Sequence, residues 1–136
     1  MEPLNRIAKG NSVYAMFFCG GVPVEGPWFP TAQEDELQVG VMERPAGYEV
    51  KAHRHPVIPR KVQGMCEFLY IESGKVRVQV YDEEWNVIGE QELGSGDFLL
   101  FLRGGHGLTM LEPTRMIEVK QGPYMGEAKN KEFRPI

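Results

Sequence analysis

Three histidines and one glutamate of this chain have a spacing that is typical of a metal site. His53 and His55 are separated by one residue, Glu67 follows after a further 11, and His106 is the third and last histidine. Three neutral imidazoles and one carboxylate form a complete ligand set for a divalent transition metal. We therefore expect one such ion to be bound by His53, His55, Glu67 and His106.

The residues around the first three candidate ligands predict strands. Residues two apart on a strand point to the same face, so His53 and His55 would lie side by side. Glu67 would share a strand face with the apolar residues Leu69 and Ile71. A carboxylate among apolar neighbours is costly to bury unless a cation accompanies it, and a metal held by the two histidines would supply that cation.

His106 occurs in the glycine-rich segment 103–107, Arg-Gly-Gly-His-Gly. We expect a bend there that brings the imidazole in from a neighbouring strand. A lone histidine in a β protein is more often a hydrogen-bonded residue than a ligand. The joint pattern of three histidines and one glutamate is what favours metal binding here.

Short strand-like segments recur along the chain, and each ends at turn residues. They cover residues 12–18, 37–42, 65–71, 75–81, 87–93, 98–102, 108–111 and 114–120. Helical periodicity is nearly absent, and only residues 3–9 could form a short turn of helix. Together with 16 glycines and 10 prolines, this pattern predicts an all-β sandwich or barrel.

The length of 136 residues indicates a single domain, with a core over about residues 12–120. Residues 121–136 form a polar tail that either is disordered or lies over the mouth of the barrel. The two cysteines, Cys19 and Cys66, are expected to be free thiols. Cys66 precedes Glu67 and would therefore face away from the metal site.

Charge and hydropathy exclude several classes of partner. A net charge of −4 without any basic run argues against nucleic-acid and membrane-surface binding. The longest apolar stretch, 98–102, is too short to span a bilayer. The first residues lack the pattern of a signal peptide, so we expect a cytoplasmic protein.

The order of glycines and candidate ligands resembles that of the cupin superfamily. The pattern Gly47-x5-His53-x-His55-x11-Glu67-x6-Gly74 resembles the first cupin motif, and the run from Gly96-Asp97 to His106 resembles the second. The resemblance covers about residues 37–120. It implies a small antiparallel jelly-roll (double-stranded β-helix) barrel that holds Fe, Mn, Ni, Co, Cu or Zn through His53, His55, Glu67 and His106.

The chain departs from the cupin pattern at two places. The gap of 11 residues between His55 and Glu67 replaces the usual three or four, and it adds a longer loop near the site at small entropic cost. In the second motif Leu102 stands where the family has a proline, and His106 arrives one residue early. The chain also resembles the small single-domain cupins of unassigned function.

A metal with four protein ligands would keep up to two coordination positions open, as a catalytic ion does. The site would carry about one positive charge and favour an anionic substrate. Four cations could assist binding: Arg60 and Lys61 in the long loop, Arg103 beside His106, and Lys120 on the last strand. For each of these four cations, a solvated surface charge is the simpler interpretation. For Arg103, the two glycines that follow it favour a place near the cavity.

Three functions fit this sequence, and the fold does not choose among them. The first is a metal-dependent enzyme, a dioxygenase or an isomerase/epimerase, acting on a small polar or anionic sugar or oxo acid. The alternative is a non-catalytic module that binds a small carbohydrate or organic anion. A third is a metal-free cupin in which His53 or His55 transfers protons. The individual catalytic residues remain unknown.

We also expect a homodimer, because small cupins often pair through edge strands. Residues 12–18 are the candidate edge, since an exposed apolar edge strand needs to be covered.

Overall fold

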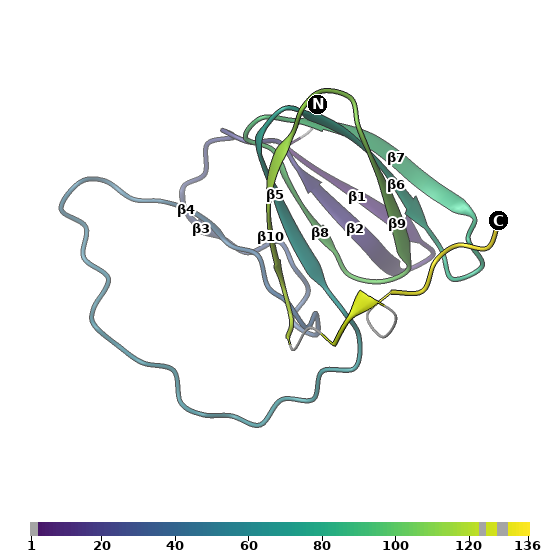
Figure 1. The fold of residues 1–136 in the computed structure, drawn as a ribbon. Coiled ribbons are helices and arrows are strands. Elements are labelled where there is room, and N and C mark those ends of the chain that lie inside the picture. The colour runs from purple at the N-terminus through teal and green to yellow at the C-terminus, as the bar shows by residue number, and fades with distance from the viewer. Residues whose placement is uncertain (1–2, 123–124, 128–130) are drawn as a thin grey trace.

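Figure 1 shows the computed structural model of the protein, which describes residues 3–122, 125–127 and 131–136. The ten elements in this part of the chain are all strands, as the sequence predicted. They are β1 (Leu4–Lys9), β2 (Ser12–Phe18), β3 (Gly26–Trp28), β4 (Val41–Glu43), β5 (Glu67–Ser73), β6 (Lys75–Tyr81), β7 (Val87–Gly94), β8 (Phe98–Phe101), β9 (Gly105–Met110) and β10 (Arg115–Lys120).

The strands form three antiparallel sheets. The largest has five strands in the order β1-β2-β8-β5-β10, the second has three in the order β7-β6-β9, and β3 pairs with β4. The fold class is therefore all-β with antiparallel sheets. Within the described residues, the strand pairing does not close into one continuous barrel.

The main core lies between the five-stranded and the three-stranded sheet. Apolar residues at every second position of the strands form this core. Leu69 and Ile71 of β5 face Val76, Val78 and Val80 of β6, and all five are buried. Side chains of one face of a strand recur every second residue, so each sheet presents an apolar inner face to the other. The packing of the two sheets therefore fixes the relative positions of the inward side chains at the ends of the strands.

The outer face of the five-stranded sheet is apolar as well. Met16, Phe18 and Leu100 are buried there beneath the segment that carries β3 and β4, which contributes Trp28 and Val39. The Phe18 ring stacks on Phe98 and meets Trp28 edge to face. The β3–β4 segment therefore acts as a partial third layer over this sheet.

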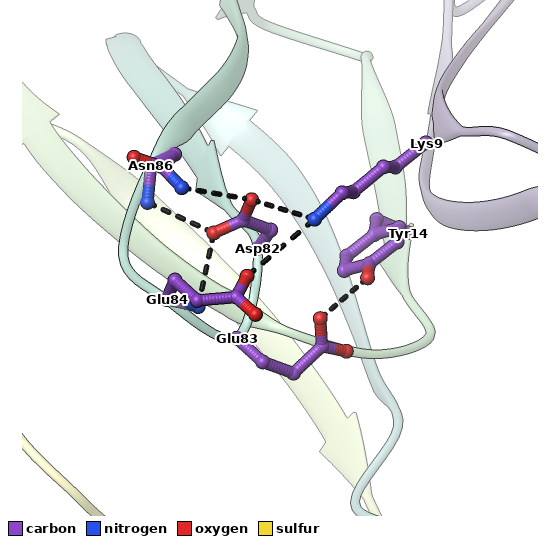
Figure 2. Close-up of polar contacts among 6 residues, drawn as sticks. All are labelled: Lys9, Tyr14, Asp82, Glu83, Glu84 and Asn86. Atoms are coloured by element: carbon purple, nitrogen blue, oxygen red, sulfur yellow. Dashed lines mark hydrogen bonds and ion pairs between the residues drawn. The ribbon is translucent and has the colours of Figure 1, made fainter.

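The turn between β6 and β7 is organised by the buried Asp82, as Figure 2 shows. Its carboxylate accepts hydrogen bonds from the backbone N–H groups of Glu84 (3.0 Å) and Asn86 (2.9 Å). Lys9 Nζ of the β1–β2 hairpin lies 3.1 Å from Asp82 and 3.4 Å from Glu84. Asp82 thus shapes its own turn and ties it to the first hairpin.

Two sequence predictions for the N-terminal part are wrong. The segment 3–9 does not form a helical turn but contains strand β1, because Gly10, with φ +61°, reverses the chain so that β1 pairs with β2. The segment 12–18 is not an edge strand, because β2 lies between β1 and β8 and is buried from Tyr14 to Phe18. The expected strand 37–42 is replaced by the shorter β4, Val41–Glu43, which shares only residues 41 and 42 with it.

Candidate functional site

The structure brings together two of the four predicted metal ligands. His106 Nε2 lies 3.1 Å from Glu67 Oε2, and the two side chains are 28% and 16% exposed. Glu67 is the first residue of β5 in the five-stranded sheet, whereas His106 belongs to β9 in the three-stranded sheet. The pair therefore links the two sheets at one end of the core.

Strand register explains why the two side chains meet. Glu67 shares the inner face of β5 with Leu69 and Ile71, and His106 lies opposite the inward Val80 of β6. Phe101, the register partner of Glu67 on β8, stacks under the His106 ring with 3.8 Å between centroids and 9° between planes. The imidazole is thus held from below by an aromatic ring and from one side by a carboxylate.

The bend predicted in the glycine-rich segment 103–107 is present at residues 103 and 104, directly before β9. β9 begins at Gly105, so His106 lies in a strand. A Cβ on Gly104, where φ is +73°, would lie 2.3 Å from the carbonyl oxygen of Tyr81, and a Cβ on Gly105 would lie 2.7 Å from the Trp85 ring. These glycines let β9 approach the Tyr81–Trp85 pair closely.

The surroundings lower the pKa of Glu67. The hydrogen bond from His106 is the largest cause; the charges of His106, Lys120 and Lys131 act in the same direction, and burial opposes them. A cationic neighbourhood favours the carboxylate form. Glu67 is therefore an anion at neutral pH, a state suited both to a metal ligand and to a partner for a protonated histidine.

The predicted cations are distributed unevenly around this pair. Lys120 is the register partner of Glu67 on β10, with its Nζ 3.0 Å from Glu118. The Arg103 guanidinium donates to the carbonyl of Val13 (2.9 Å) and lies 3.9 Å from Asp35. Lys120 is thus adjacent to the pair, while Arg103 contacts β2 through Val13 and the loop that carries Asp35.

Arg60 and Lys61 line a separate pocket. Its volume is about 550 Å³, and its other walls include Glu34, Asp35 and Glu36. Because both acids and bases line it, this pocket has no single charge preference. Glu36 accepts hydrogen bonds from the backbone N–H groups of residues 63 and 64, which fastens this end of the loop.

The strand predicted beneath His53 and His55 is not formed. Both residues lie in the long segment between β4 and β5, which has no regular secondary structure and forms a wide loop in Figure 1. Their ring centroids are 5.2 Å apart, and His53 Nδ1 lies 2.7 Å from the Lys51 carbonyl oxygen. Among the described residues, no three His, Cys, Asp or Glu side chains are grouped as a metal would require.

Sequence analysis missed three residues near the Glu67–His106 pair. Phe101 belongs to the apolar stretch 98–102, and its register with Glu67 places it under His106. In the tail, Arg134 donates to the Tyr81 hydroxyl (3.2 Å) and covers its ring, and Lys131 contributes to the low pKa of Glu67. The basic residues of the tail were the sequence feature that could have indicated these contacts. Residues 123–124 and 128–130 of that tail lie outside the described part.

Comparisons with known proteins do not identify a family. No protein-family model, curated protein or solved structure matches this chain. Within the described residues, no helix is long and apolar enough to cross a membrane. Both cysteines are free thiols, as expected.

Proposed function

We propose that this protein is a metal-binding cupin that holds one divalent transition metal at the end of its sheets and there acts on a small polar or anionic substrate. The observation that carries the proposal is the contact of 3.1 Å between Glu67 and His106. Two residues that the cupin pattern assigns as ligands come from different sheets and meet, with Glu67 as an anion. Their chemistry fits Fe, Mn, Ni, Co, Cu or Zn.

The remaining ligands do not fit the ion in the described arrangement, because His53 and His55 lie in the loop between β4 and β5. We infer that this loop adds a strand to the three-stranded sheet. β9 is the outer strand of that sheet, so one edge is available for pairing. A strand that pairs there with the His53 and His55 side chains inward would present them on the same face as His106.

The composition of the loop supports such a movement. Val50, Val57 and Ile58 are 70%, 100% and 53% exposed, and burying apolar side chains is favourable. Closing a long loop costs little more than closing a short one, roughly 0.6 kcal/mol for each doubling of its length. The added strand would also bring the fold closer to the closed jelly roll of the cupin pattern.

The chain itself supplies three functions at this site. Glu67 and Phe101 orient the His106 imidazole, Lys120 and Lys131 add positive charge that favours an anionic substrate, and the core beneath excludes water. A bound metal would supply Lewis-acid or redox chemistry. A dioxygenase and an isomerase/epimerase are the two reaction types that we propose; the alternative is a non-catalytic module that binds a carbohydrate or organic anion.

The test is metal content by mass spectrometry after each candidate ion has been offered and excess removed. We expect about one equivalent in the unchanged protein and a large loss in His55→Ala and in His106→Ala. Arg54→Ala is the matched control, because Arg54 lies between the two histidines and would point the other way in the proposed strand. Retention of metal in His55→Ala would contradict the four-ligand site.

The same contact favours a second candidate, in which Glu67 and His106 act as a metal-free acid–base pair. A carboxylate that holds an imidazole at 3.1 Å is a common arrangement for proton transfer. The two candidates differ in the histidine NMR signals when Zn²⁺ is added. Metal binding predicts that the signals of all three histidines shift together at one equivalent, whereas the acid–base pair predicts that His106 does not respond.

A further inference from the structure

The Glu67–His106 pair lies at one end of the two sheets, where several strands begin or end. β5 begins at Glu67 and β9 at Gly105, whereas β6 ends at Tyr81 and β10 ends at Lys120. Strand register joins these ends, because Lys120 is the partner of Glu67 and Tyr81 is the partner of Gly105. A segment that crosses between the two sheets at this end therefore passes close to the pair.

The C-terminal tail is attached beside both sheets at this end. At its start, the side-chain oxygen of Gln121 accepts a hydrogen bond (2.9 Å) from the backbone N–H of Cys66, directly before Glu67. Further along, Arg134 Nη1 lies 3.2 Å from the Tyr81 hydroxyl, and the guanidinium lies over the Tyr81 ring, 5.3 Å from its centroid. Figure 1 shows the described part of the tail extending from the end of β10 toward the turn between β6 and β7.

The contact of Arg134 with Tyr81 is suited to hold the end of the chain. Tyr81 is 6% exposed, and its hydroxyl donates to Gln79 Oε1 (2.8 Å), so the ring has a fixed position. A guanidinium that covers an aromatic face and also donates to its hydroxyl makes two favourable contacts at once. Lys131, three residues before Arg134, contributes to the lowered pKa of Glu67, so its charge lies near this carboxylate.

We propose that residues 131–136 form a strap over the Glu67–His106 pair, clamped by Arg134 on Tyr81, and that this strap opens before a ligand reaches His106. The apolar side chains of the strap do not resist opening, because Phe133 is 66% exposed and Ile136 is fully exposed. A segment with few buried contacts opens locally at small free-energy cost. The strap controls access to the site of the proposed function, and its importance for ligand binding rests on that function.

Chemical modification of His106 in metal-free protein tests the strap. Diethyl pyrocarbonate modifies accessible imidazoles, and mass spectrometry of the peptides gives a rate for each histidine. The His106 side chain is 28% exposed. We expect its rate to rise roughly twofold or more in Arg134→Ala and in a variant that lacks residues 131–136. Tyr81→Phe keeps the ring and loses only the hydroxyl, so its effect should be smaller.

Two kinds of control accompany this measurement. His53 and His55 lie in the loop between β4 and β5, whereas the clamp is at the end of β6, so their rates should not change. Arg77→Ala is the matched control variant, because Arg77 lies on the same strand as Tyr81 and forms an exposed ion pair with Glu90 (3.4 Å). Thermal unfolding shows whether each variant is folded.

Each outcome bears on a separate part of the proposal. An unchanged rate for His106 in the folded variant without residues 131–136 would overturn the strap. A faster rate in that variant with an unchanged rate in Arg134→Ala would overturn the clamp. Because the measurement uses metal-free protein, its result is independent of the metal-content test of the proposed function.

Discussion

Glu67 and His106 hold each other in position, and the charge of Glu67 depends on His106. Glu67 is partly buried, and burial alone would raise its pKa, but the hydrogen bond from His106 outweighs that effect. A folded-state pKa below the ordinary value means that the carboxylate contributes stability at neutral pH. That contribution is lost as the pH falls through the lowered pKa.

Replacing the histidine should therefore change the titration of Glu67. We expect His106→Gln to raise the pKa of Glu67, because a neutral amide cannot replace the charge that His106 contributes and donates a weaker hydrogen bond, while burial remains. The measurement is an NMR titration of the Glu67 side-chain carboxyl carbon. Lys120→Gln is a useful comparison and should have a smaller effect. An unchanged pKa in His106→Gln would mean that the lysines alone set the charge of Glu67.

Asp82 gives a residue-scale prediction away from the candidate site. Hydrogen bonds, first that from the Asn86 backbone, lower its pKa from 3.8 to about 2. We expect Asp82→Asn to lower the midpoint of thermal unfolding at neutral pH. The difference from the unchanged protein should shrink as the pH falls from about 4 toward 2, because the unchanged Asp82 also becomes protonated there.

The control for this prediction is Glu92→Gln on the same hairpin. The Glu92 carboxylate lies 3.9 Å from Lys75 at the surface, and such exposed pairs contribute little. A loss of stability in Asp82→Asn that stays constant from pH 7 to pH 2 would show that shape, and not charge, accounts for the role of Asp82.

At the scale of elements, the loop between β4 and β5 differs most from its predicted form. The sequence predicted a strand under His53 and His55 from their alternation. Alternation is compatible with a strand, but a strand also needs a neighbour that accepts its hydrogen bonds. By contrast, β6 forms at its predicted bounds, because Val76, Val78 and Val80 alternate and both β7 and β9 pair with it.

If the loop adds a strand to β9, metal should slow the exchange of its backbone amides. We expect hydrogen exchange over residues 52–57 to become slower when Zn²⁺ is added, with no change in β2. The physical reason is that ladder hydrogen bonds protect amides from solvent. If Zn²⁺ slowed the exchange of these amides in His106→Ala as well, the docking of the loop would not depend on metal binding at His106.

At the scale of the whole molecule, two apolar sheet faces provide the stability. Ile71 is completely buried between the sheets, so Ile71→Ala should cost about 2–5 kcal/mol in free energy of unfolding. Val87→Ala is the control: Val87 is 51% exposed, and its loss should cost about 0.5 kcal/mol or less. Urea denaturation measures both. Equal costs would contradict the assignment of the core to the space between the sheets.

The fold class could be predicted from the sequence, whereas the order of strands in the sheets could not. Short alternating segments and turn glycines indicated an all-β protein. The place of β2 inside a sheet depends on β1, whose pairing depends on the turn at Gly10. Of the candidate site, the sequence predicted Glu67 and His106 as ligands of one metal ion, and the structure places these two side chains in contact. It could not show that Phe101 lies beneath them, because that follows from the register of β5 with β8.

The division of the Glu67–His106 pair between two sheets has a consequence for folding kinetics. Hairpins such as β6–β7 close over short stretches of chain and can form early. Glu67 and His106 meet only after distant strands have paired and the sheets have packed, which is a slow, non-local step. A collapsed chain with all its hairpins in place would contain every residue of the candidate site and still lack the site itself.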